Sequence, residues 1–97
     1  MKMKEILNQQ ARLVILRSLT ECRGEANDSM LQSCLDVYGV KVSRDEVRTQ
    51  QAWLAEQGLV TNEDIAGCIV STLTGRGQDV AEGRAVVPGV KKPRIGG

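Results

Sequence analysis

The chain of 97 residues has no histidine and no phenylalanine, and it has only one tryptophan and one tyrosine. The absence of histidine removes the commonest general base of enzymes and the commonest nitrogen ligand of zinc. A nucleophile would need lysine or a carboxylate as its base, and the sequence has no clustered set of such residues. The scarcity of aromatic rings also argues against base stacking on single-stranded nucleic acid. We therefore expect a protein that is not an enzyme.

Long apolar segments are also missing. No run approaches the roughly 20 residues that a membrane-spanning helix needs. The opening MKMKEILNQQ becomes polar before the apolar centre of a signal peptide would form. These absences predict a cytoplasmic protein with no membrane partner.

The three cysteines are widely spaced, and no CxxC pair occurs. Because histidine is absent, Cys22, Cys34 and Cys68 do not form a zinc-binding pattern, and we expect no metal. We interpret them as small buried apolar residues, with a redox pair of Cys22 and Cys34 as the alternative. Gly75 and Gly77 have the spacing of a phosphate-binding loop, but the βαβ unit and the acidic residue of a dinucleotide site are missing. We therefore expect no cofactor.

Charge is nearly balanced over the whole chain but not along it. The 13 basic and 12 acidic residues give a formal net charge of +1. Residues 28–83 carry four basic and nine acidic side chains, whereas residues 84–97 carry four basic and no acidic ones. The last segment also holds both prolines and has no hydrophobic period. We expect one folded domain over residues 1–83 and a flexible basic tail over residues 84–97.

The spacing of apolar residues predicts three helices, near residues 4–20, 28–38 and 44–57. Ser43 and Glu46 form the S-x-x-E capping box that begins the third helix, and Gly58 ends it. Leu13 to Leu16 are apolar on every face of the first helix, more than a small chain is expected to cover. Either the small core surrounds this run or a second subunit covers it, and we expect a homodimer through the first helix.

The second part of the chain predicts strands. Residues 59–73 hold two β-branched stretches around a polar turn at residues 62–67, which is typical of a β-hairpin. Thr74 can cap a short last helix that Gly83 ends. The expected fold class is therefore mainly α with a small β-hairpin. Two helices joined by a tight turn and followed by a hairpin form the winged helix-turn-helix arrangement, whose second helix enters the major groove of DNA.

Three motifs resemble winged-helix repressors. Residues 12–19, RLVILRSL, resemble the opening of ArsR-like repressors, and residues 53–60, WLAEQGLV, resemble the passage from recognition helix to wing in the ArsR and MarR groups. LTGRG at residues 73–77, with AEG at residues 81–83, is similar to the segment that follows the wing. With VPGVKKP at residues 87–93, the chain looks like a family of small proteins encoded in Mu-like prophages.

This resemblance implies a winged-helix fold and a role as a phage-type transcriptional regulator or DNA-handling accessory factor. Metal-sensing ArsR proteins carry paired thiols on the helix-turn-helix, whereas this chain has only Cys34 there. The resemblance therefore does not extend to metal sensing.

Candidate DNA contacts follow from the geometry of the helix near residues 44–57. Two arginines lie at the border of its outer face, from which arginine can pair with guanine or bind phosphate. The basic residues of the tail can reach the DNA backbone or minor groove. We therefore expect duplex DNA as the partner, contacted by Arg44, Arg48, Thr49, Lys41, Lys91, Lys92 and Arg94.

Local charge favours a different partner. Carboxylates share the outer face of the same helix and the turn of the wing, where they would repel phosphates. The alternative is an adaptor that docks a basic protein partner on its acidic helix-turn-helix and wing, with the two arginines as ordinary solvated residues paired to neighbouring carboxylates. The acidic residues concerned are Asp45, Glu56, Glu63 and Asp64.

Overall fold

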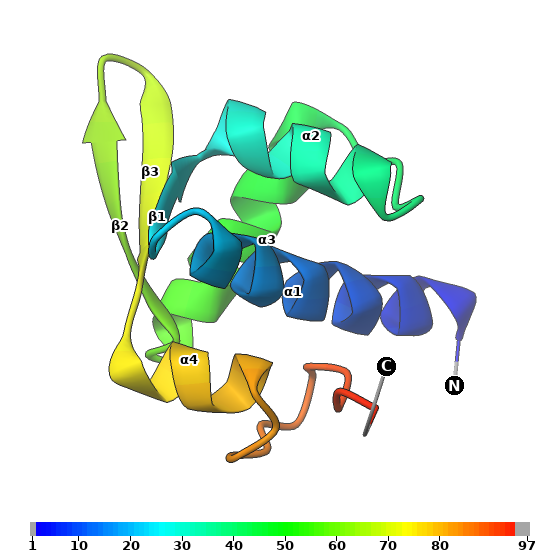
Figure 1. Ribbon diagram of the computed structural model, residues 1–97. Helices are drawn as coiled ribbons and strands as arrows, with labels where there is room; N and C mark the ends of the chain where they lie inside the picture. The colour runs from blue at the N-terminus through cyan, green and yellow to red at the C-terminus, as the bar shows by residue number, and fades with distance from the viewer. Residues whose placement is uncertain (1, 95–97) are drawn as a thin grey trace.

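The computed structural model describes residues 2–94 of the chain. Within them, four helices lie to one side of a three-stranded antiparallel sheet, which makes a small α+β domain (Figure 1). In chain order the elements are α1 (Met3–Glu21), β1 (Glu25–Asn27), α2 (Asp28–Val37), α3 (Arg44–Glu56), β2 (Val60–Ile65), β3 (Cys68–Leu73) and α4 (Gly75–Ala81).

The helices begin and end within about two residues of the predicted positions. The capping box of α3 is present: the Ser43 hydroxyl accepts from the amide of Glu46 at 3.1 Å, and the Glu46 carboxylate accepts from the amide of Ser43 at 3.3 Å. For α2 the cap is Asn27, whose side chain accepts from the amide of Met30 at 2.8 Å. Local capping signals therefore predicted the helix starts correctly.

Helix α1 lies at the centre of the domain, where it contacts the other three helices and strands β1 and β3. Its run from Leu13 to Leu16 is buried on all sides, with each side chain no more than 4% exposed. Of the two possibilities for this run, the structure shows cover by the core, because α2, α3, α4 and the sheet surround it. The run itself therefore gives no reason for a second copy.

The sheet contains one strand more than the predicted hairpin. Strand β1 pairs antiparallel with β3, with Glu25 opposite Thr72 and Asn27 opposite Val70, so the strand order is β1-β3-β2. The predicted turn at residues 62–67 is also too long. Strands β2 and β3 continue to Ile65 and Cys68, and only the two residues between them make the turn.

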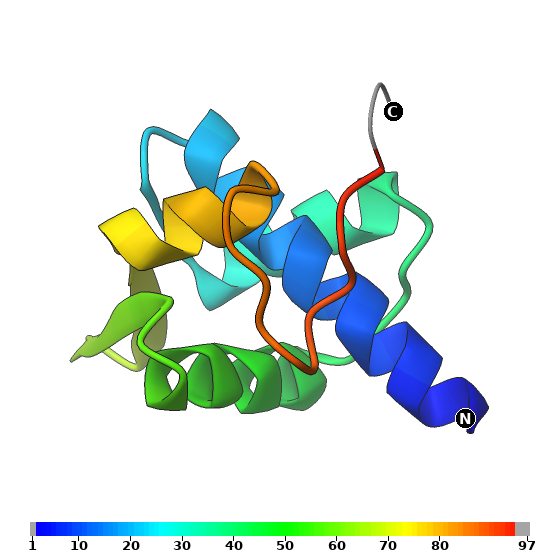
Figure 2. The same cartoon turned by 90° about the horizontal axis from the view of Figure 1, so that it is seen from below.

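The C-terminal segment, residues 84–94, folds back along α1 instead of forming the predicted flexible tail (Figure 2). Val87 and Val90 are buried in the core, and the amide of Lys91 donates to the carbonyl of Gln9 at 3.2 Å. The Arg12 guanidinium donates to the carbonyl of Gly89 at 2.9 Å. The prediction is wrong for residues 84–94, because these contacts join residues about 80 positions apart in the sequence and leave no local pattern. Residues 95–97 of the predicted tail lie outside the described residues.

The Gly75-x-Gly77 motif has a packing role. A Cβ atom on Gly77 would lie 2.0 Å from the carbonyl oxygen of Leu59, so only glycine permits α4 to approach the chain that leads into β2. The hydroxyl of Thr74 accepts from the amide of Gly77 at 3.0 Å and caps the helix. Gly77 therefore lets the start of α4 lie against the chain just before β2.

Candidate nucleic-acid interface

The candidate nucleic-acid interface consists of α3 and the β2–β3 hairpin. Arg48, a predicted DNA contact, donates from Nε to the carboxylate of Asp28 at 2.7 Å and from Nη2 to the carbonyl of Gly67 at 2.8 Å. The Asp28 side chain is fully buried at the start of α2. Arg48 thus joins α2, α3 and the tip of the hairpin, and its guanidinium serves a structural ion pair.

The electrostatics of Asp28 agree with this role. Burial by itself disfavours the carboxylate, but hydrogen bonds from Arg48 and from the amides of Ile69 and Ser29 outweigh it and lower the pKa of Asp28. The same hydrogen bond raises the pKa of Arg48. Sequence alone does not reveal this pair, because Arg48 lies 20 residues from Asp28, whereas the predicted partner of Arg48 is DNA, with a neighbouring carboxylate as the alternative.

Arg44 points toward the same place. Its Nε donates to the side-chain oxygen of Gln32 at 3.0 Å, and its Nη1 lies 3.9 Å from the Asp28 carboxylate. The side chains of Arg44 and Arg48 remain 43% and 40% exposed. Both arginines therefore lie on the side of α3 that faces α2, and part of each side chain stays accessible to solvent.

A buried polar network joins α3 to the hairpin. The Gln51 amide donates to the carbonyl of Ile69 and to the hydroxyl of Ser71, both at 2.9 Å. The Ser71 hydroxyl donates to Asn62, whose own amide donates back to the carbonyl of Gln51 at 2.9 Å. Gln51 and Ser71 are fully buried. The hairpin is therefore held in a fixed orientation relative to α3.

The exposed side of α3 is acidic. Its outward residues are those that helical geometry predicted, and Thr49 among them donates its hydroxyl to the carbonyl of Asp45 at 3.0 Å. The hairpin adds Asp64 on the side of the sheet that faces α3, whereas Glu63, opposite Val70, points to the other side. We define the acidic surface as Asp45, Thr49, Ala52 and Glu56 of α3 with Asp64 of β2, all exposed.

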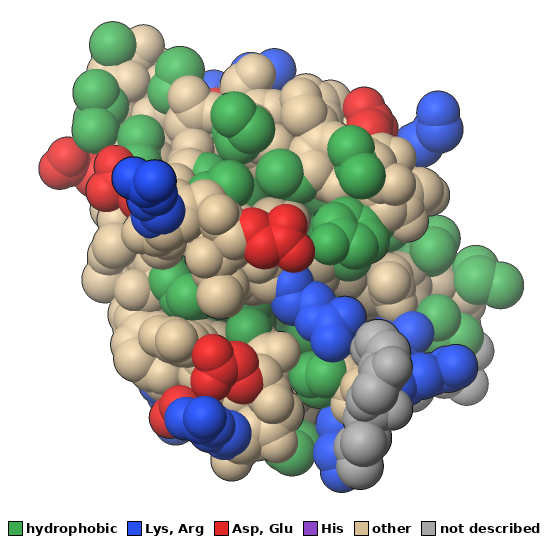
Figure 3. Space-filling view, viewed as in Figure 1, with side chains coloured by type: hydrophobic (Ala, Val, Ile, Leu, Met, Phe, Trp, Pro, Cys, Tyr) green, Lys and Arg blue, Asp and Glu red, His purple; other side chains and the backbone are tan. Residues whose placement is uncertain are grey.

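The other predicted contacts lie elsewhere. Lys41 is exposed in the turn between α2 and α3, and Lys91 donates to the side chain of Gln10 on α1 at 2.9 Å. Lys92 and Arg94 border a hollow of about 480 Å³ beside Arg17 of α1. Figure 1 places the hairpin and the C-terminal segment at opposite ends of the molecule, and Figure 3 shows basic side chains gathered at the C-terminal end. The structure therefore does not join the predicted contacts into one surface.

The cysteines are half-buried rather than buried, and Cys22 packs against the core as a small apolar residue would. Burial raises the pKa of the Cys22 thiol, and the neighbouring Cys34 thiol, which shares a hydrogen bond with it, raises that pKa further. The structure thus brings together the pair named as the redox alternative. A raised pKa lowers the fraction of reactive thiolate at neutral pH.

Neither a metal-binding group of side chains nor a membrane-spanning helix is found within residues 2–94. Among residues 2–94, no group of three or more cysteine, aspartate or glutamate side chains is arranged to hold a metal ion. Within the same range, no helix combines the length and the apolar character needed to cross a membrane.

Fold and surface together define a small α+β domain with an acidic region on α3 and the hairpin and a basic region at the C-terminal end. The chain is 66% identical over 90 residues to the uncharacterized protein gp26 of Escherichia phage Mu, covering 93% of this chain and 94% of gp26. It is 47% identical over 77 residues to an uncharacterized protein of Haemophilus influenzae, covering 78% and 76% of the two chains. No family model and no solved structure matches the chain. The chain belongs to the family of phage Mu gp26.

Proposed function

We propose that α2 and α3 form a helix-turn-helix with the β2–β3 hairpin as its wing, and that this winged-helix domain is a non-enzymatic adaptor. Its partner is a basic surface of another protein of the phage. One observation carries the proposal: the acidic surface occupies the position from which a winged helix would contact DNA, while both arginines expected there turn toward Asp28.

Electrostatics support a protein partner over DNA. Duplex DNA carries a phosphate charge about every 1.7 Å of its axis, and the carboxylates of Asp45, Glu56 and Asp64 on the acidic surface would approach that charge. A lysine- or arginine-rich protein surface reverses the sign of every one of these interactions. The fixed orientation of hairpin and helix also holds Asp64 in place relative to the carboxylates of α3.

A charge-reversal experiment tests this proposal. We expect a synthetic oligolysine peptide to bind the intact protein at low ionic strength and to lose affinity as salt is added. Replacing Asp45 and Glu56 together by lysine should weaken binding about tenfold, since each exposed pair contributes up to about 1 kcal/mol. The matched control replaces Asp36 and Asp79, exposed acids on α2 and α4, by lysine. Equal losses in the two double variants would contradict a specific acidic surface.

The second candidate is binding of duplex DNA, as a phage-type transcriptional regulator. The accessible edges of Arg44 and Arg48 favour it, because arginine at the start of such a helix pairs with guanine. If α3 reads bases, Arg44→Ala should cost about 1–3 kcal/mol on a preferred site and relax its sequence preference. Arg48→Ala is a poorer test, because it leaves the buried Asp28 without its closest partner.

The basic end of the molecule needs its own variant. Truncation after Gly83 would remove the buried Val87 and Val90, so the double variant Lys92→Ala with Arg94→Ala is cleaner. If only this end binds DNA, the double variant should flatten the salt dependence while Arg44→Ala binds as before. If the intact protein retards no duplex even at low ionic strength, DNA is not the partner.

A further inference from the structure

The cysteines Cys22 and Cys34 lie where the end of α1 meets α2. Cys22 is the residue that follows α1, and its amide donates to the carbonyl of Ser18 at 2.9 Å. Cys34 lies in the second half of α2, and the two thiols share a hydrogen bond. The proposed function uses neither of these thiols.

A second contact, which does not involve the thiols, places the same two segments side by side. Tyr38, the C-cap of α2, lies four residues after Cys34, so both side chains project from one side of the helix. The Tyr38 hydroxyl donates to the carboxylate of Glu21, the residue before Cys22, at 3.3 Å. The end of α1 therefore meets this side of α2 at two neighbouring positions.

Both thiols can be reached from solvent, because each cysteine is half-buried. The third cysteine, Cys68, begins β3 opposite Ile65, at the tip of the hairpin and away from the end of α1 (Figure 1). A thiol reacts faster with a group that the fold holds beside it than with a distant one, because the effective concentration is higher. The fold therefore favours a bond between Cys22 and Cys34 over either bond to Cys68.

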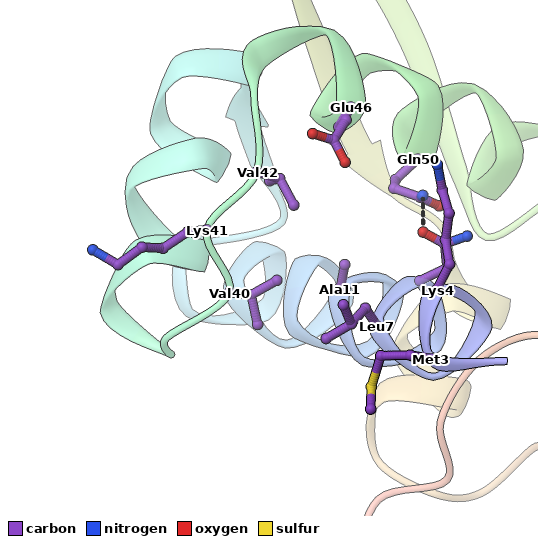
Figure 4. Close-up of a pocket in the computed structure, with 10 residues that line it drawn as sticks. Met3, Lys4, Leu7, Ala11, Val40, Lys41, Val42, Glu46 and Gln50 are labelled. Carbon is purple, nitrogen blue, oxygen red and sulfur yellow. Dashed lines mark hydrogen bonds between the residues drawn. The ribbon is translucent and has the colours of Figure 1, made fainter.

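The middle of α1 is buried in the core, whereas its two ends are joined to their neighbours by polar contacts that water can reach. Near its start, Gln50 of α3 donates to Asn8 at 3.2 Å (Figure 4). Near its end lies the exposed hydrogen bond from Tyr38 to Glu21. Contacts of this kind contribute little net stability. A covalent bond at Cys22 would therefore be a much stronger connection than those that hold this end now.

We propose that Cys22 and Cys34 form a reversible disulfide when the protein meets a small disulfide oxidant, and that this bond fastens the end of α1 to α2. The thiolate of one cysteine attacks a sulfur of the oxidant, which forms a mixed disulfide and releases one thiol. The thiolate of the other cysteine attacks the protein sulfur of that mixed disulfide and releases the second thiol. The protein loses two electrons and two protons, and the oxidant is reduced to two thiols.

The bond closes the loop from Cys22 to Cys34, which contains β1 and the first half of α2. Closing a loop of this length restricts the unfolded chain and raises the folding equilibrium constant by up to about 100-fold. The loop includes Asp28, the partner of Arg44 and Arg48. Oxidation therefore favours the form in which both arginines turn toward Asp28. The proposal rests on the thiols and does not depend on the proposed function.

The test treats the intact, freshly reduced protein with hydroxyethyl disulfide, an uncharged probe that the carboxylate of Glu21 does not repel. A mildly alkaline buffer is used, because burial raises the pKa of the Cys22 thiol. The number of free thiols should fall from three to one. Dithiothreitol should restore all three. A product in which the probe stays attached to Cys22 or Cys34 would overturn the proposal.

Trypsin identifies the bond, because arginines and lysines separate the three cysteines into different peptides. Residues 18–23 should be joined to residues 24–41, with a free Cys68 in residues 49–76. A bond through Cys68 in place of this one would also contradict the proposal.

Stability separates a bond that fits the fold from one that distorts it. The oxidised protein should unfold at a higher urea concentration than the reduced protein. Cys34→Ser should gain nothing from the probe, whereas Cys68→Ser, the matched control on the hairpin, should keep the full gain. An oxidised protein no more stable than the reduced one, or a gain that survives Cys34→Ser, would show that the bond does not fasten α1 to α2.

Discussion

At the scale of the residue, Asp28 links the stability of the fold to pH. Its carboxylate is buried, and its hydrogen bonds lower its pKa in the folded protein. In the unfolded chain this pKa returns to about 4. A carboxylate whose pKa is lower in the folded state adds stability that is fully present above the unfolded pKa. That contribution is lost as the pH falls through the folded pKa.

The lowered pKa of Asp28 predicts that Asp28→Asn and the unchanged chain differ in unfolding free energy by an amount that depends on pH. We expect the variant to be less stable at neutral pH, with the gap in unfolding free energy narrowing as the pH falls below about 4. Urea denaturation at several pH values measures the gap. Asp36→Asn, an exposed carboxylate on the same helix, should shift stability little at any pH. A gap for Asp28→Asn that stays constant with pH would show that its ionisation does not stabilise the fold.

A second residue, Gly89, holds the C-terminal segment in place. The Arg12 guanidinium stacks 3.9 Å from the centroid of the Trp53 ring and donates to the Gly89 carbonyl. A Cβ atom on Gly89 would lie 2.6 Å from the same ring, and its φ of +100° disfavours any other residue. We expect Gly89→Ala to destabilise the protein by about 1–3 kcal/mol.

The control for this substitution isolates the steric overlap. Gly83 also has a positive φ, +80°, but an added Cβ would meet only Pro93, at an ordinary 3.9 Å. Because Trp53 is the one tryptophan of the chain, its fluorescence reports directly on the Arg12–Gly89 contact. The emission should shift in Gly89→Ala and not in Gly83→Ala. Identical emission and stability in the two variants would contradict the packing role.

At the scale of the element, the hairpin turn carries a strained residue. Ala66 and Gly67 both have positive φ, +53° and +85°, as in the type I′ turn that asparagine-glycine favours. Alanine is costly in this conformation, whereas asparagine tolerates it. We expect Ala66→Asn to raise the unfolding free energy by about 0.5–1 kcal/mol and Ala66→Val to lower it. Urea titration checks both, and an asparagine variant no more stable than the natural chain would contradict the turn assignment.

Elements were predictable from sequence where their signals are local. The Ser43–Glu46 capping box and the Gly58 stop lie within or beside α3, and the alternation of residues 59–73 is complete within the hairpin itself. Strand β1 was missed because three residues carry too little pattern, and it forms only by pairing with β3, more than 40 residues later. The fold of the C-terminal segment was missed for a similar reason, because it depends on contacts with α1, far away in the sequence.

The candidate site was less predictable than the fold. Helical geometry placed Asp45, Thr49 and Glu56 on the outer face of α3 correctly. It did not reveal that Arg48 and Arg44 turn toward Asp28, because that choice depends on how α2 packs against α3.

At the scale of the whole molecule, opposite charges are separated. The acidic surface lies on α3 and the hairpin, whereas the basic side chains gather at the C-terminal end (Figure 3). Copies of such a molecule attract one another weakly, end to end, and salt screens this attraction over about 10 Å. The apolar run from Leu13 to Leu16, the one feature that favoured a specific dimer, is covered within each chain.

These two observations predict the oligomeric state. Sedimentation equilibrium at moderate salt should give the mass of a single chain from micromolar to near-millimolar concentration. A dimer that dissociates as salt rises would place the contact between the acidic surface and the basic end. A dimer that persists at high salt would contradict the single-chain prediction and indicate an apolar contact between copies.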